Sequence, residues 1–123
     1  MNFDKFNEKI MLIDPTIRYA AVQNNDGENI CGHIQEGITP YLSDDEIKMM
    51  HYYAGQRWDT RKRIAHKIGN AKYAMAEYDK IKRFTFPIDE ERLLMLTTEI
   101  NSDSSKIIPK VLELIKNIQG NEV

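Results

Sequence analysis

The first apolar positions of the chain recur at intervals of three and four residues, the period of a helix with one apolar face. Asp14-Pro15 follows directly, and Pro disfavours helical backbone in the residue before it. The spacing therefore predicts a helix over residues 3–13, with its apolar face formed by Phe3, Phe6, Ile10 and Ile13.

Two segments of β-compatible residues come next, over 17–23 and 28–35. Between them stands Asn24-Asn25-Asp26-Gly27, and Asn, Asp and Gly tolerate the positive φ of a tight reversal. We expect a β-hairpin here.

A long helix is predicted to begin at Asp44. Ser43 is followed three residues later by Glu46, which is the signature of a capping box. The first stop signal is Gly69-Asn70, so the helix extends to about Ile68. At ~100° per residue, one face of this helix is apolar and consists of Ile47, Met50, Ala54, Trp58, Ala65 and Ile68. Arg61 falls within the same stripe.

The rest of the chain predicts three antiparallel strands and a final helix. The strands cover roughly 71–78, 81–88 and 92–99, and Phe84 and Phe86 share one face of the middle strand. The last helix begins near Ser104 or Ser105, and residues 119–123 are expected to fray.

The order is therefore helix, two strands, long helix, three strands, helix. Strand hairpins combined with segregated helices indicate a two-layer α+β domain. We expect a single domain over residues 1–123, with one five-stranded antiparallel sheet, the long helix on one face and the terminal helices packed together.

Composition narrows the class of protein. A chain of 123 residues, 41% hydrophobic and 29% charged, suits one folded core and is neither disordered nor fibrous. Seventeen basic and nineteen acidic residues leave a net charge of -2, so no global positive field attracts nucleic acid or anionic lipid. Cys31 is the single cysteine. The first residues lack a charged-then-apolar pattern and no apolar run approaches the ~20 residues that span a bilayer, so we expect neither a leader nor a membrane span. We expect a cytoplasmic protein that does not contact membranes.

The element order resembles the Roadblock/LC7 and profilin-like group of small α+β domains over nearly the whole chain. The sequence also resembles a set of small uncharacterised archaeal proteins. The segments that carry this second similarity are Arg18-Tyr19-Ala20-Ala21-Val22, Asp26-Gly27, residues 32–37, Arg57 with Arg61, residues 72–76 and residues 82–87. The Roadblock resemblance implies dimerisation through the long helix and a sheet edge, and regulatory contact with a partner such as a small GTPase or a signalling complex.

Three side chains of the long helix lie away from its predicted core stripe: Met49, Tyr52 and Tyr53. Aromatic side chains and Met are enriched at protein interfaces. An open sheet also leaves edge strands with unpaired backbone groups. We expect these three residues to form the interface of a homodimer.

The second half of the same helix is basic. Its cations are Arg57, Arg61, Lys62, Arg63 and Lys67, together with His66, and such a patch can hold phosphates. However, Asp59 can pair with Arg63 and the chain is acidic overall, so we favour a solvated helix end and do not expect nucleic-acid binding. Arg61 requires a carboxylate, carbonyl oxygens or a partner chain to offset its desolvation.

Cys31 and His33 stand two positions apart on one strand and so project to the same face. With His51 or His66 they are able to form a metal site, but a packed thiol and a surface histidine are the commoner explanations. We expect neither a metal nor a cofactor.

Two function classes remain open. No phosphate-binding glycine loop, nucleophile elbow, paired-cysteine zinc site or HExxH helix is present, so an enzyme is disfavoured. The first class is a non-enzymatic regulatory or scaffolding module. The second is a small-ligand sensor with a pocket between the sheet and the long helix, near Tyr73, Phe84, Phe86 and Trp58.

Overall fold

The computed structural model of the protein describes residues 2–121. Within that range the predicted order of elements is confirmed, with one short additional helix after the long one. The elements are α1 (Phe3–Met11), β1 (Ile17–Asn24), β2 (Asn29–Ile34), α2 (Asp44–Arg63), α3 (Ala65–Ile68), β3 (Ala74–Glu77), β4 (Ile81–Pro87), β5 (Arg92–Glu99) and α4 (Ser104–Asn121).

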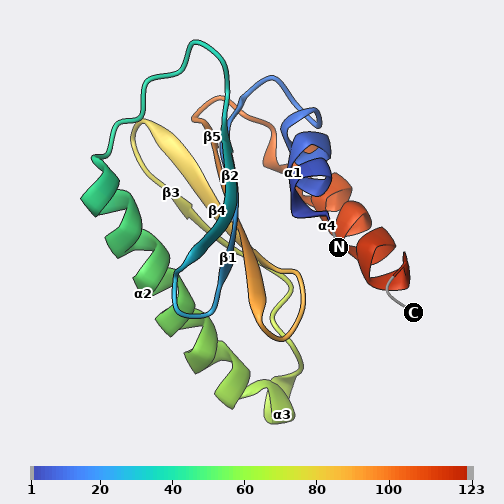
Figure 1. The fold of residues 1–123 in the computed structure, drawn as a ribbon. Coiled ribbons are helices and arrows are strands. Elements are labelled where there is room, and N and C mark those ends of the chain that lie inside the picture. The colour runs from blue at the N-terminus through green and yellow to red at the C-terminus, as the bar shows by residue number, and fades with distance from the viewer. Residues whose placement is uncertain (1, 122–123) are drawn as a thin grey trace.

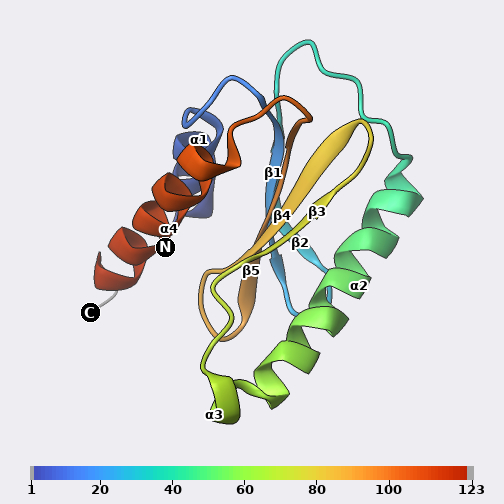
Figure 2. The same cartoon turned by 180° about the vertical axis from the view of Figure 1, so that it is seen from behind.

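The strands form one antiparallel sheet in the order β2-β1-β5-β4-β3. Helix α2 lies on one face of this sheet, and α1 and α4 pack together on the other (Figures 1 and 2). The predicted α+β class, the five-stranded antiparallel sheet and the pairing of the terminal helices are thus confirmed. The expectation of two layers is wrong, because both faces of the sheet are covered and the molecule has three.

The main core lies between the sheet and the two terminal helices. Phe84 and Phe86 of β4 face this side, with their rings stacked at a centroid distance of 6.2 Å. Phe84 pairs with Leu96 of the neighbouring strand β5, and Phe86 pairs with Leu94. Both leucines lie on the same face of the sheet as the phenylalanines. The other contributors come from β1, α1 and α4: Ala20, Val22, Phe6, Ile10, Ile107 and Val111.

The contact between α2 and the sheet is built from smaller side chains. Ala54 of α2 packs against Ala21 and Met95 on the sheet. Gly55 allows the helix to approach the turn between β1 and β2, where a methyl group at position 55 would lie 2.1 Å from the Asn25 carbonyl oxygen. The predicted turn also has the expected backbone, with φ of 87° at Gly27.

The start of α2 is as predicted, and its end is not. Ser43 and Glu46 form the full capping box, because each side chain bonds the backbone N–H of the other. The sequence predicts a helix that continues to Ile68, but α2 ends at Arg63, and α3 follows after a break at Ile64. Figure 1 shows this end of α2 and α3 reaching below the strands. With no sheet beneath it, Ile68 is 78% exposed rather than part of the core stripe.

The remaining boundaries differ by a few residues. The strand predicted over 71–78 is ordered as a strand only over Ala74–Glu77, since it pairs on one side alone. Helix α4 begins at Ser104 as expected, and Asp103 accepts a hydrogen bond from the Ser105 N–H at 3.1 Å. Its helix extends through Asn121, so the predicted fraying does not begin at residue 119, and residues 122–123 lie outside the described residues.

Candidate functional site

The exposed side of α2 carries the three residues predicted to meet a second chain. Met49, Tyr52 and Tyr53 are each about half exposed, while the sheet-facing side of the helix is formed by His51, Ala54, Gly55 and Trp58. The rings of Tyr52 and Tyr53 meet edge to face at 5.3 Å. The structure therefore groups the three side chains on the solvent side of α2 as one apolar surface.

Strand β3 forms one open edge of the sheet. Strand β3 is the outermost strand beyond β4, so one side of its backbone has no partner strand within residues 2–121. Ile81 and Arg83 of β4 line the same cavity as Met50 and His51 of α2, so β4, the neighbour of β3 in the sheet, lies beneath the sheet-facing side of α2. Tyr73, at the start of this edge, is also exposed.

The predicted basic residues differ in their exposure and in what they contact. Arg57, Arg63 and Lys67 are exposed, and Lys67 belongs to α3, beyond the helix break. Arg61 lies over the Trp58 ring, 5.3 Å from its centroid. Lys62 donates to the Glu90 carbonyl oxygen, so its charge is directed at the turn between β4 and β5. The desolvation of Arg61 on the apolar stripe is therefore offset by a cation–π contact with Trp58. This contact is not among those predicted from the sequence.

Cys31 and His33 lie on the face of β2 that is turned toward the terminal helices. His33 shares a contact of 3.1 Å between its Nδ1 and the amide nitrogen of Asn7, a buried residue of α1 that also donates to the Ala20 carbonyl oxygen. Burial raises the pKa of the Cys31 thiol, which makes it a poor nucleophile. His51 lies on the opposite side of the sheet, and within residues 2–121 no three His, Cys, Asp or Glu side chains gather as metal ligands.

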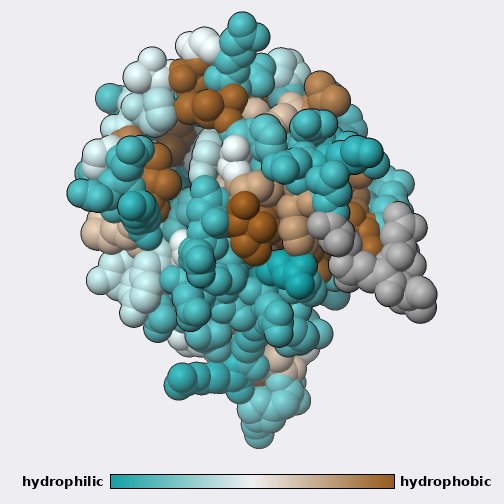
Figure 3. All heavy atoms as spheres, in the orientation of Figure 1, coloured by the Kyte–Doolittle hydropathy of each residue, from teal (hydrophilic) through white to brown (hydrophobic). Residues whose placement is uncertain are grey.

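The pocket predicted between the sheet and the long helix exists, but its residues were predicted wrongly. A cavity of about 100 Å³ lies between the sheet and the first half of α2, under the segment that joins β2 to α2. Its walls are mainly apolar and include Ile38, Leu42, Ile47, Met50 and Met95. In Figure 3 apolar side chains gather in the upper part of the molecule, where Figure 1 shows the joining segment and the start of α2.

The residues predicted to line that pocket lie elsewhere. Phe84 and Phe86 point into the core under the terminal helices, and Tyr73 packs against Phe86 at 6.0 Å. Strand alternation places the two phenylalanines on one face, but the sequence does not show which face α2 covers. Trp58 lines a separate and wider cavity of about 520 Å³ near the other end of α2, which also includes Arg61, Lys62 and residues of α4.

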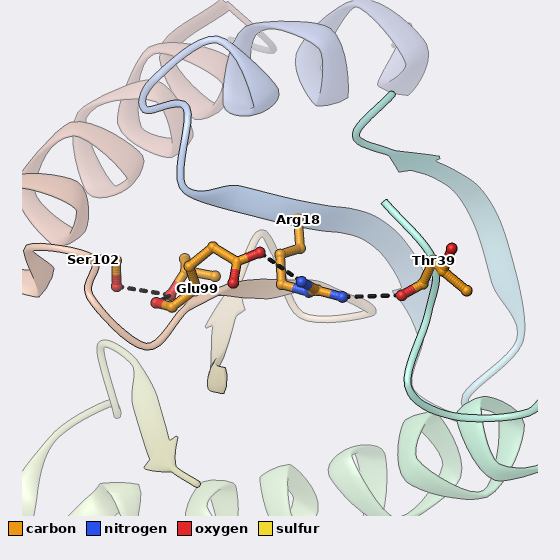
Figure 4. A network of polar contacts seen from close by, with 5 residues as sticks. Arg18, Thr39, Glu99 and Ser102 are labelled. Atoms are coloured by element: carbon orange, nitrogen blue, oxygen red, sulfur yellow. Dashed lines mark hydrogen bonds and ion pairs between the residues drawn. The ribbon is translucent and has the colours of Figure 1, made fainter. Parts of the chain in front are cut away.

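Arg18 lines the smaller cavity and holds in place the segment that covers it. The one sequence signal for this role is a cation within a mainly apolar strand. The Nη1 of Arg18 pairs with Glu99 at 2.5 Å, and its Nη2 donates to the Thr39 carbonyl oxygen at 3.1 Å (Figure 4). The guanidinium also lies 4.6 Å from the centroid of the Tyr41 ring. These contacts tie the β2–α2 segment to β1 and β5.

The far wall of the cavity holds two further nitrogen groups, Arg83 and His51. Burial, and after it the nearby Arg83 charge, lower the pKa of His51 to about 4, so the imidazole is neutral at pH 7. Its ring stacks on Tyr19 with centroids 6.2 Å apart. This wall of the mainly apolar cavity therefore carries one cation, Arg83, and one neutral hydrogen-bond donor, His51.

The fold defines the class of protein. It is similar to the Roadblock/LC7 domain from Streptomyces avermitilis, with a TM-score of 0.76 and 14% identity over 98% of each chain. It is also similar to the gliding protein MglB from Thermus thermophilus, with a TM-score of 0.74 and 12% identity over 96% of this chain and 88% of that one. For profilin II from Acanthamoeba castellanii the TM-score is 0.65, with 9% identity over 97% of this chain and 98% of that one. The expected Roadblock/LC7 and profilin-like fold is confirmed.

Within that class the chain belongs to DUF6659, a family of unknown function whose model matches residues 2–121. A comparison with curated proteins found no match. Across residues 2–121, no helix is both long enough and apolar enough to cross a membrane.

Proposed function

We propose that this protein is a non-enzymatic regulatory or scaffolding module that acts in the cytoplasm as a homodimer and docks a protein partner such as a small GTPase. The observation that supports this best is the exposed apolar surface of Met49, Tyr52 and Tyr53 on the outer side of α2. A second feature is the edge strand β3, whose outer backbone edge has no partner strand within residues 2–121. The likeness to Roadblock/LC7 domains and to a gliding protein supports the same class of role.

Two-fold pairing explains both features at once. Edge strands attract another strand, and a contiguous apolar helix face is costly to leave in water. A two-fold axis lets a single patch meet its own copy, so one contact covers both surfaces in both chains. Partner docking then uses surfaces that the dimer leaves exposed, including the basic residues Arg57, Arg63 and Lys67.

The dimer is tested by changing Tyr52 and Tyr53 together to Glu. Because exposed positions tolerate charge and interface positions do not, the double variant should fold and sediment as a monomer at micromolar concentration, while the wild type sediments as a dimer. A matched control changes Leu12 and Ile68 to Glu, since these are also exposed apolar residues and lie away from the proposed interface. The control should remain dimeric.

A monomeric wild type, or a Tyr52→Glu/Tyr53→Glu variant that dimerises with unchanged affinity, would show that the interface is wrong. Regulatory contact is tested separately with purified small GTPases of the host in GDP-bound and GTP-bound form. We expect association with one nucleotide state in preference to the other. Equal or absent binding in both states would remove the GTPase from the proposal and leave the homodimer untouched.

A further inference from the structure

The polar wall of the cavity under α2 carries a positive charge that has no carboxylate partner among residues 2–121. Two guanidinium groups line this cavity, and they differ in what they contact. Arg18 is satisfied by the Glu99 carboxylate and the Thr39 carbonyl oxygen. Arg83 is half-buried, and within residues 2–121 no carboxylate oxygen lies within 4.0 Å of its nitrogen atoms.

The surroundings of Arg83 increase this imbalance. Burial lowers the pKa of its guanidinium, a side-chain hydrogen bond with the Tyr78 hydroxyl favours the charged form, and the positive charge of Arg57 opposes it. Desolvating a charge without a counter-ion is costly, so structures normally pair such a group. The cavity beside Arg83 has mainly apolar walls, and its Tyr78 contact is a neutral hydroxyl, so no residue of the described range supplies Arg83 with a counter-ion.

His51 adds a second polar contact to the same wall. The side chain is buried and stacked on Tyr19, and no residue in the described range forms a hydrogen bond with its ring nitrogens. A neutral imidazole has one N–H to donate. An anion held by Arg83 can therefore receive a hydrogen bond from His51 without a second full charge being buried.

We propose that this cavity binds a short aliphatic monocarboxylate, with its carboxylate on the Arg83 guanidinium beside His51 and its tail among Ile38, Ile47, Met50 and Met95. The guanidinium fork matches the two oxygens of a carboxylate, and charge-assisted pairs of this kind are strong and directional. The methionine side chains adapt to a branched or a linear tail.

The size and the polarity of the cavity define this ligand class. An engineered apolar cavity of about 150 Å³ holds benzene, so the space of about 100 Å³ found here fits a tail of roughly three to five carbons. A phosphate ester carries more charge than one unpaired guanidinium balances and needs more donors than these walls present. A neutral hydrocarbon would leave Arg83 without a counter-ion.

The proposal is independent of the homodimer, because the cavity lies on the sheet side of α2 and the proposed interface lies on its outer side. The probe is isovalerate, titrated to millimolar concentration and followed through labelled methionine methyl groups. The methyls of Met50 and Met95 line the cavity, whereas Met11 packs under the terminal helices and Met49 is exposed. We expect saturable shifts at Met50 and Met95 and none at Met11 or Met49.

Two comparisons test the recognition of the carboxylate. Isoamyl alcohol has the same tail without the charge and should shift the two methyl groups at least about tenfold less effectively, since a hydrogen bond to a charged group is lost. On the protein side, Arg83→Met should weaken isovalerate binding by a similar factor. The control Arg63→Met removes an exposed cation at the end of α2, outside the cavity lining, and should not weaken binding.

The outcomes are distinguishable. Equal shifts with acid and alcohol, binding that survives Arg83→Met, or no shift at Met50 and Met95 would each overturn the proposal. The acid-against-alcohol comparison uses wild-type protein, so it decides the matter even if Arg83→Met fails to fold.

Discussion

Gly55 of α2 lies directly against the backbone of Asn25, so closely that a methyl group at position 55 would sit 2.1 Å from the Asn25 carbonyl oxygen. The two residues belong to different elements, since Asn25 is in the turn between β1 and β2. This contact sets how near α2 approaches the turn between β1 and β2.

Gly55→Ala should destabilise the fold by about 2 kcal/mol, although the same change in an ordinary helix interior stabilises by about 1 kcal/mol through backbone entropy. The reason is a clash with backbone atoms that cannot move aside as a side chain would. Chemical denaturation measures the free energy of unfolding. Gln56→Ala, at the exposed neighbouring position, is the control and should have little effect, and a stabilised Gly55→Ala variant would contradict the close contact.

Ser43→Ala should lower the free energy of unfolding by about 1 kcal/mol, because the Ser43 hydroxyl accepts the Glu46 N–H at the start of α2. Glu46 reaches back to the Ser43 N–H at 2.9 Å. The hydrogen bond from the Ser43 N–H lowers the pKa of the Glu46 carboxyl, so the stability it contributes is present at neutral pH and is lost as the pH falls through the lowered value. Ser43→Asp keeps a side-chain acceptor and should retain most of the stability. Equal losses of unfolding free energy in Ser43→Ala and Ser43→Asp would show that the hydrogen bond from the Glu46 N–H does not stabilise the helix.

His51 should make the protein less stable in mild acid. Its pKa falls from an ordinary 6.5 to about 4 in the folded chain, first through burial and then through Arg83. Between these two values the unfolded chain binds a proton at His51 and the folded chain does not, so stability decreases as the pH falls through this window, by an amount on the order of 2 kcal/mol. His51→Phe keeps a ring against Tyr19 without the titration. The difference in unfolding free energy between variant and wild type should therefore change with pH, and a constant difference would refute the assignment.

The pair formed by Arg18 and Glu99 should behave as a partly buried ion pair, since Arg18 is buried while the Glu99 side chain is 36% exposed. The Arg18 side chain is only 10% exposed, so Glu99→Ala leaves a desolvated cation and should cost about 2 to 3 kcal/mol. Replacing both residues by Met removes the charge altogether and should recover part of that loss. Asp89→Ala breaks the longer, 3.6 Å contact with Arg92, whose side chain is 30% exposed, and should cost less than about 1 kcal/mol. Similar losses at the two sites would contradict this view.

Several features follow from the sequence alone, because the interactions that form them are local. The turn at residues 24–27, the capping box at Ser43 and the start of α4 each depend on residues within a few positions of one another. Alternation along a strand likewise determines that Phe84 and Phe86 share a face. The order of elements, and through it the Roadblock/LC7 likeness, could be predicted from these signals.

Tertiary structure decided the rest. Which helices cover which face of the sheet depends on contacts between distant segments, so sequence reasoning placed Phe84 and Phe86 on the wrong side of the sheet. Helix α2 ends at Arg63, where Figure 1 shows it reaching beyond the strands, and no helix stop signal stands in the sequence near Ile64. The partners Arg18 and Glu99 stand 81 positions apart, and the cavity they help to roof exists only once β1, β5 and the β2–α2 segment have come together.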